Sequence, residues 1–158
     1  EFPVLLEHEA PCLQAYRPET AIAEKLHVLV DLGMANSRMK DFFDLRFLAR
    51  NFDFGGEDLT RAIVATFDRR ATPVPRSCPT ALSPEFAADE LKATQWRAFL
   101  RRSRLLPQEC SLGETVAAAR ELLLPLLTAL ADGRAFEETW LAGGPWREDR
   151  RPLSRPDC

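Results

Sequence analysis

The sequence predicts a mainly helical protein with a marginal β component. Apolar side chains recur at three- and four-residue spacing over most of the chain, which is the period of an amphipathic helix. Glycines and prolines interrupt these stretches and divide the chain into separate helices. Two short apolar pieces near the N-terminus, residues 2–6 and 12–16, suggest strands. The 158 residues, 46% of them hydrophobic, can form one domain of ordinary size or part of a larger one.

The first helix is predicted over residues 19–32. Pro18 suits its start because proline fixes a helical φ, and Gly33 is expected to end it. Lys25 falls between two apolar rows of this helix, whereas His27 lies on its polar side and is expected to be solvated. The rows consist of Ile22, Leu26 and Leu29 and of Ala21, Val28 and Leu32. A lysine in this position either extends along its own stem into water or faces an anion in a cleft.

The second helix, predicted over residues 37–51, mixes charges with large apolar side chains. Asn36 or Ser37 is expected to cap its first turn with a side-chain oxygen. Arg38 and Asp41 fall at helical spacing on the same stripe as two leucines. A charge within an apolar stripe is costly unless it is paired or binds a ligand. This segment is therefore the place where chemistry is expected.

The rest of the chain predicts three further helices, a linker and a tail. The helices are expected at 57–70, 89–103 and 112–132. Three prolines within residues 72–79 exclude a helix there. Leucines crowd residues 122–130, and Pro125 is expected to bend the helix that contains them. The predicted divisions are residues 1–72, a linker at 73–82, a helical domain at 83–146 and a disordered tail at 147–158.

Composition limits the classes of function. The net charge of −3 argues against a strongly basic nucleic-acid surface over the whole molecule. The four cysteines lack the spacing of a zinc site, so free thiols in a reducing, cytoplasmic setting are expected. No apolar run approaches the length of a membrane span, so no membrane partner is expected.

Several short blocks follow one another along the chain in a recognisable order. They are Glu19-Thr20, Ala23-Glu24-Lys25-Leu26, residues 36–45, residues 52–56, Thr66-Phe67 with Arg70 and Thr72, Gln95-Trp96 with Phe99, and Trp140 with Gly143-Gly144-Pro145-Trp146. This series resembles the C-terminal part of the AbiEii/AbiGii-type nucleotidyltransferase toxins. The resemblance covers nearly all of residues 1–146, which makes it more specific than any single block.

The resemblance implies a polymerase-β-like nucleotidyltransferase core followed by a helical C-terminal domain. It implies transfer of a nucleotide from a nucleoside triphosphate (NTP) to an acceptor such as tRNA. Such enzymes are the toxin half of bacterial toxin–antitoxin and phage-defence systems, so a cognate antitoxin is an expected partner. Their Mg²⁺ ions are held by an Asp-x-Asp pair, which this sequence lacks. The metal-binding half is therefore expected to lie before Glu1, and this chain alone is expected to be inactive.

The resemblance also assigns roles to residues. It implies that Lys25 and Asp41 are catalytic, with Asp44 as the alternative aspartate. Nucleotidyl transfer depends on neutralising phosphate charge, which suits a lysine as a point charge. Arg38 is expected to orient Asp41 or to contact phosphate. The expected substrate-binding residues are Arg38, Lys40, Asp44 and Glu24, and no metal ligand is expected within the chain.

A non-catalytic helical module that binds an antitoxin or another protein is the alternative. The missing Asp-x-Asp pair favours it, and so does the leucine-rich surface at 122–130, which a partner would cover.

Overall fold

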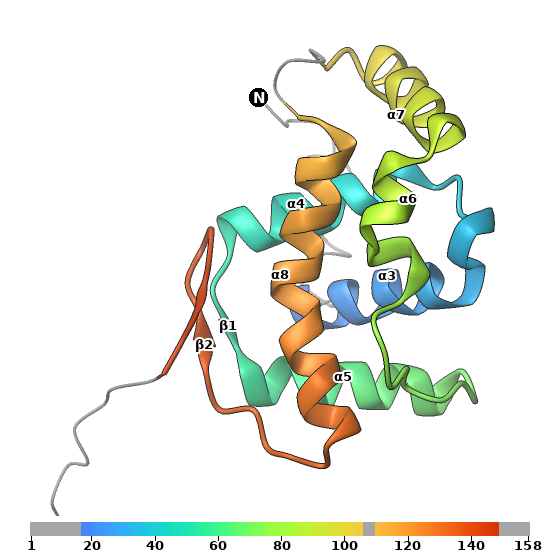
Figure 1. Cartoon of the computed structure of the whole chain (residues 1–158). Helices are drawn as coiled ribbons and strands as arrows, with labels where there is room; N and C mark the ends of the chain where they lie inside the picture. The colour runs from blue at the N-terminus through green and yellow to red at the C-terminus, as the bar shows by residue number, and fades with distance from the viewer. Residues whose placement is uncertain (1–16, 106–109, 149–158) are drawn as a thin grey trace, which may run out of the picture.

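A computed structural model describes residues 17–105 and 110–148 of the chain. This part is mainly helical, with a small three-stranded sheet at one side (Figure 1). The helices are α3 (Pro18–Leu32), α4 (Met39–Asn51), α5 (Gly56–Arg69), α6 (Pro84–Ala88), α7 (Glu90–Arg102) and α8 (Leu112–Ala131), with 3₁₀ turns η1 (Gly33–Ala35) and η2 (Thr80–Leu82). The strands are β1 (Phe54–Gly55), β2 (Thr139–Trp140) and β3 (Trp146–Arg147). The predicted strands at 2–6 and 12–16 and the tail residues 149–158 lie outside the described residues.

The five predicted helices are confirmed, with differences at their ends. A short further helix, α6, precedes α7 at the start of the predicted helical domain, and the extended backbone of Asp89 ends it. The Asp89 side chain then caps α7 by accepting the backbone N–H of Lys92. Ser111 and Glu114 form a capping box at the start of α8, which continues through Pro125 to Ala131.

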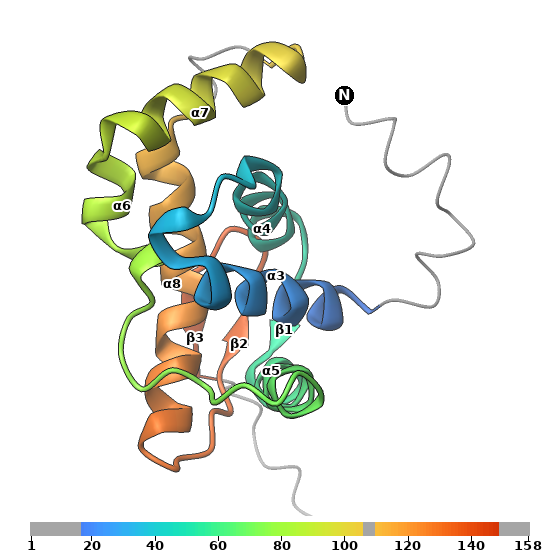
Figure 2. The same cartoon turned by 90° about the vertical axis from the view of Figure 1, so that its right-hand side faces the viewer.

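Helix α3 lies between α4 and α5, and α8 packs across this layer. Figures 1 and 2 show the three helices stacked in the same order from two directions. The most extensive packing joins α3 to α5 and α4 to α8, while α6 and η2 also lie against α8. The helix with the predicted catalytic lysine is thus held on both sides by its neighbours.

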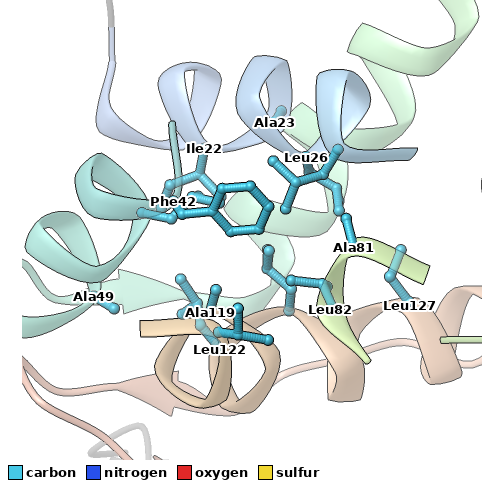
Figure 3. Packing of buried hydrophobic residues seen from close by; sticks show 14 of the residues in the cluster. Ile22, Ala23, Leu26, Phe42, Ala49, Ala81, Leu82, Ala119, Leu122 and Leu127 are labelled. Carbon is cyan, nitrogen blue, oxygen red and sulfur yellow. The ribbon is translucent and has the colours of Figure 1, made fainter. Parts of the chain in front are cut away.

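One hydrophobic core joins the N-terminal and C-terminal parts. Figure 3 shows Leu26 and Phe42 on one side of it and Leu122 of α8 on the other, with Leu82 of η2 between them. Ala81 and Leu82, which fall within the predicted linker, are completely buried. The division into a core part and a helical domain stays a prediction, although both contribute to this core.

The small sheet was not predicted. Strand β2 pairs antiparallel with β1 and with β3, and Arg147, which was expected to begin the tail, lies opposite Thr139. Strands of two residues are too short to produce an alternating pattern in the sequence. The indole N–H of Trp140 donates to the Ala49 carbonyl at 2.7 Å, and that of Trp146 donates to the Leu122 carbonyl at 2.9 Å. The tryptophans therefore fix the sheet to α4 and α8.

The described cysteines, Cys78 and Cys110, are free thiols. Cys78 is exposed, whereas Cys110 is buried with its Sγ 3.0 Å from the Thr115 hydroxyl. None of the described helices is long and apolar enough to cross a membrane.

Replacement of Gly56 by alanine is expected to lower the free energy of unfolding by about 1–3 kcal/mol, as overpacking does. The new Cβ would lie 2.7 Å from the Phe136 carbonyl and 2.8 Å from that of Glu138. The backbone cannot easily move away, because the Gly56 N–H donates to the Glu138 carbonyl at 2.8 Å. Denaturation by urea measures the change. Gly113→Ala is the matched control, since its Cβ would meet only Ser111 Oγ at 4.0 Å. Equal losses for both variants would contradict this account.

Candidate active site

Lys25 of α3 bridges two carboxylates of α4. Its Nζ donates to Asp41 Oδ1 at 3.1 Å and to Asp44 Oδ2 at 3.0 Å. The Asp41 and Asp44 side chains are only 8% and 14% exposed, so both charges are largely removed from water. The Lys25 side chain, 22% exposed, is turned toward α4 and does not extend into water. The structure thus brings together the two residues that the resemblance marks as catalytic.

Each carboxylate also has a second cationic neighbour, which comes from α4 itself. Arg38 Nε lies 3.0 Å from Asp41 Oδ2, and Lys40 Nζ donates to Asp44 Oδ2 at 2.8 Å. Arg38 and Lys40 are more than half exposed. The Arg38 contact is a charge pair without hydrogen-bond geometry, so Asp41 Oδ2 has no hydrogen-bond donor among the described residues. We call these five residues the α3–α4 charge cluster; its three cations exceed its two carboxylates.

Helical spacing explains how the cluster forms. Asp41 and Asp44 are three residues apart in α4, so both side chains face the same neighbouring helix. The stem of Lys25 leaves α3 beside the buried residues Ile22 and Leu26, which directs its Nζ toward α4. The charged residues that the sequence places among apolar ones therefore form an ion-pair network at the edge of the core.

The connector between α3 and α4, residues 33–38, differs from the prediction. Helix α4 begins at Met39 with Arg38 at the N-cap position, and no side chain caps the helix there. Asn36 Oδ1 instead accepts the backbone N–H of Arg38 at 2.8 Å, one residue before the helix. Asn36 is completely buried, and its own carbonyl accepts a hydrogen bond from Lys92 Nζ at 2.8 Å. This contact was not predicted from the sequence. The feature that could have indicated it is the position of Lys92 on the buried stripe of α7, four residues before Trp96.

Two polar residues of α3 lie outside the cluster. Glu24 pairs with Arg69 and Arg70 at the end of α5, so its predicted contact with substrate stays a prediction. The prediction that His27 is solvated is wrong. Its side chain is buried, its Nε2 lies 3.0 Å from the Thr72 hydroxyl, and its ring forms a T-shaped contact with the Phe67 ring at a centroid distance of 5.2 Å. The end of α5 and the turn after it cover the side of α3 that the sequence marked as polar.

The described residues contain no group of three or more histidine, cysteine, aspartate or glutamate side chains placed to hold a metal ion. The two carboxylates that converge, those of Asp41 and Asp44, have the Lys25 ammonium within 3.1 Å of both. The Lys25 ammonium therefore balances the charge of these carboxylates within the cluster.

Together, the fold and the cluster define a helical protein with a lysine–aspartate site between two neighbouring helices. A comparison with protein families matches residues 1–123 to the nucleotidyl transferase AbiEii toxin of type IV toxin–antitoxin systems. The chain therefore belongs to the AbiEii family of nucleotidyl transferase toxins. No curated protein and no solved structure matched the chain. The predicted family is thus confirmed, while the polymerase-β-like core stays a prediction.

Replacement of Lys25 by methionine is expected to lower the free energy of unfolding by about 1–3 kcal/mol, the cost of leaving a buried polar atom unsatisfied. The substitution keeps an apolar stem but leaves Asp41 Oδ1 without the donor shown here. Lys40→Met is the control, because it removes an exposed i, i+4 pair worth only about 0.3–0.5 kcal/mol. Chemical denaturation compares the two variants. A loss at Lys25 no larger than that at Lys40 would show that the bridge contributes little.

Proposed function

We propose that this chain supplies the triphosphate-facing part of the active site of a nucleotidyltransferase toxin. The enzyme transfers a nucleotide from an NTP to an acceptor such as tRNA, in the cytoplasm, under the control of a cognate antitoxin. The observation that carries the proposal is the convergence of Lys25 and Asp41 from separate helices in a protein of the AbiEii family.

The charge arrangement of the cluster supports binding of an anion. Lys25 is shared by Asp41 and Asp44, but each carboxylate keeps another cation within 3.0 Å when Lys25 moves away. A buried carboxylate without a counter-charge would be strongly destabilising. Release of Lys25 toward a phosphate avoids this, because each carboxylate keeps its second cation. The excess of cations over carboxylates also favours a negatively charged ligand.

The reaction assigns different roles to the two catalytic residues. The acceptor oxygen attacks the α-phosphorus of the NTP, the bond from that phosphorus to the bridging oxygen breaks, and pyrophosphate leaves. Lys25 neutralises phosphate charge as a point charge. Asp41 binds the acceptor hydroxyl and takes its proton, and Arg38 orients Asp41 from the preceding turn.

The metal ligands of the reaction are proposed to come from an Asp-x-Asp segment that is not part of this sequence. The family implies a divalent ion such as Mg²⁺, which would supply further neutralisation of the triphosphate. We therefore propose that the chain is inactive in transfer unless such a segment is present.

The alternative, a non-catalytic module that binds an antitoxin, loses one of its two supports. Leu122, Leu123, Leu126 and Leu127 are buried in the core of this chain. Most of the leucine-rich segment is thus covered without a partner, and the missing Asp-x-Asp pair alone favours the alternative.

Binding of NTPs to the chain, mixed with a separately expressed polypeptide that carries the Asp-x-Asp segment, tests the proposal. Isothermal titration calorimetry in the presence of Mg²⁺ gives the dissociation constants. Lys25→Ala is expected to weaken binding by about 10- to 100-fold, because a hydrogen bond between charged groups contributes about 1.5–3 kcal/mol. Arg61→Ala removes an exposed cation of α5 outside the cluster and is expected to leave binding unchanged. Unaltered affinity of Lys25→Ala would refute the proposed role.

Transfer to an acceptor is a separate test of the same proposal. With α-labelled NTPs and total tRNA, the same mixture is expected to produce labelled RNA, and Asp41→Asn is expected to abolish labelling while retaining NTP binding. Labelling at the unmodified rate by Asp41→Asn would remove Asp41 from the reaction.

A further inference from the structure

Lys92 is a buried lysine whose side chain has no acidic partner in the part of the chain that the structure describes. Its residue is 3% exposed, and among the described residues it forms no ion pair. Its Nζ donates to the Asn36 carbonyl at 2.8 Å and contacts Gln95 Oε1 at 3.4 Å, and it lies 5.3 Å from the centre of the Phe86 ring. Burial of a lysine nitrogen with only neutral acceptors is costly, so the position calls for an explanation.

We propose that Lys92 is a positioning residue for the active site, acting through the connector between α3 and α4. The effect on catalysis rests on the proposed function. The effect of Lys92 on the interaction between Lys25 and Asp41 can be measured without a nucleotide. The connector joins the helix that carries Lys25 to the helix that carries Asp41 and Asp44.

Two hydrogen bonds in series link Lys92 to Arg38, the N-cap residue of α4. The lysine holds the Asn36 carbonyl, and the Asn36 side-chain oxygen holds the Arg38 N–H, at 2.8 Å in both cases. Arg38 is the N-cap residue of α4 and is itself the second cationic neighbour of Asp41. The position of the α7 lysine is thus transmitted to the point where α4 begins, three residues before Asp41.

A space-filling role does not account for Lys92. Methionine would fill the same space beside Phe86 without the cost of burying an ammonium group. What the lysine adds is a donor that reaches across from α7 to a completely buried backbone carbonyl, and that carbonyl belongs to the connector. Because small displacements of catalytic groups reduce rates strongly, fixing the connector has a direct use at the site.

A double-mutant cycle between Lys25→Met and Asp41→Asn tests the inference in the 158-residue chain. Unfolding in urea gives the coupling between the two positions, first with Lys92 present and then with Lys92→Met. In the presence of Lys92 the two effects are expected to be non-additive, and with Lys92→Met the coupling is expected to be lost. Lys92→Arg, which keeps a donor on a long stem, is expected to restore most of it.

Trp96→Phe is the matched control, because it also removes one buried hydrogen bond made by α7, the one to the Cys110 carbonyl at 3.0 Å. It is expected to lower stability and to keep the Lys25–Asp41 coupling. If the coupling survives Lys92→Met, or if Trp96→Phe abolishes it too, or if it is absent from the unmodified chain, Lys92 does not position the site.

Asn36→Ala decides the matter if Lys92→Met fails to fold. It keeps the carbonyl that Lys92 holds and removes the side-chain oxygen that holds Arg38, while its Nδ2 has no hydrogen-bond partner among the described residues to lose. Asn36→Ala is expected to lose the Lys25–Asp41 coupling, and a retained coupling would overturn the inference.

The affinity for NTP serves as a second readout. If Lys25→Ala weakens NTP binding, Lys92→Met is expected to weaken it as well, by about tenfold. If Lys25→Ala has no effect on affinity, the proposed function fails, while the coupling still decides the role of Lys92.

Discussion

The interaction on which the site depends is the bridge from Lys25 to two largely buried carboxylates. Carboxylates that are mostly removed from water need a counter-charge, so Asp41 and Asp44 both pair with Lys25. The same ion pairs keep the lysine ammonium at the surface of α4. Because the partners belong to α3 and α4, the bridge fixes the rotation of each helix relative to the other. The geometry of the site is therefore a consequence of electrostatic pairing at the edge of the core.

Adjacent residues of α3 tie that helix to both of its neighbours. Lys25 faces α4, whereas Glu24, about 100° further round the helix, pairs with Arg69 and Arg70 of α5. Apolar packing alone would let α3 shift slightly along its neighbours, but charged contacts on both sides restrict that movement. The family block that contains Glu24 and Lys25 thus has a structural role beside the proposed chemical one.

Helical periodicity sufficed to predict the long helices, because a repeated apolar spacing indicates a helix whichever element packs against its apolar face. It did not suffice for His27, since the sequence cannot show that Thr72 and Phe67 cover the polar side of α3. The spacing of Asp41 and Asp44 predicted a shared face, but their contact with Lys25 depends on how two helices pack. The link from Lys92 to Asn36 spans 56 residues and was missed for the same reason.

The choice of lysine for the bridging position follows from what the proposed reaction requires. An arginine between Asp41 and Asp44 would bind them through a planar fork, and the rigid geometry would resist release. Lysine is a compact charge on a flexible stem, so it can exchange a carboxylate for a phosphate by rotating a few side-chain bonds. Arg38 and Lys40 then remain beside the two carboxylates. In the proposed reaction, the cluster is thus stable without substrate and still presents Lys25 to a triphosphate, because Arg38 and Lys40 continue to balance the two carboxylates.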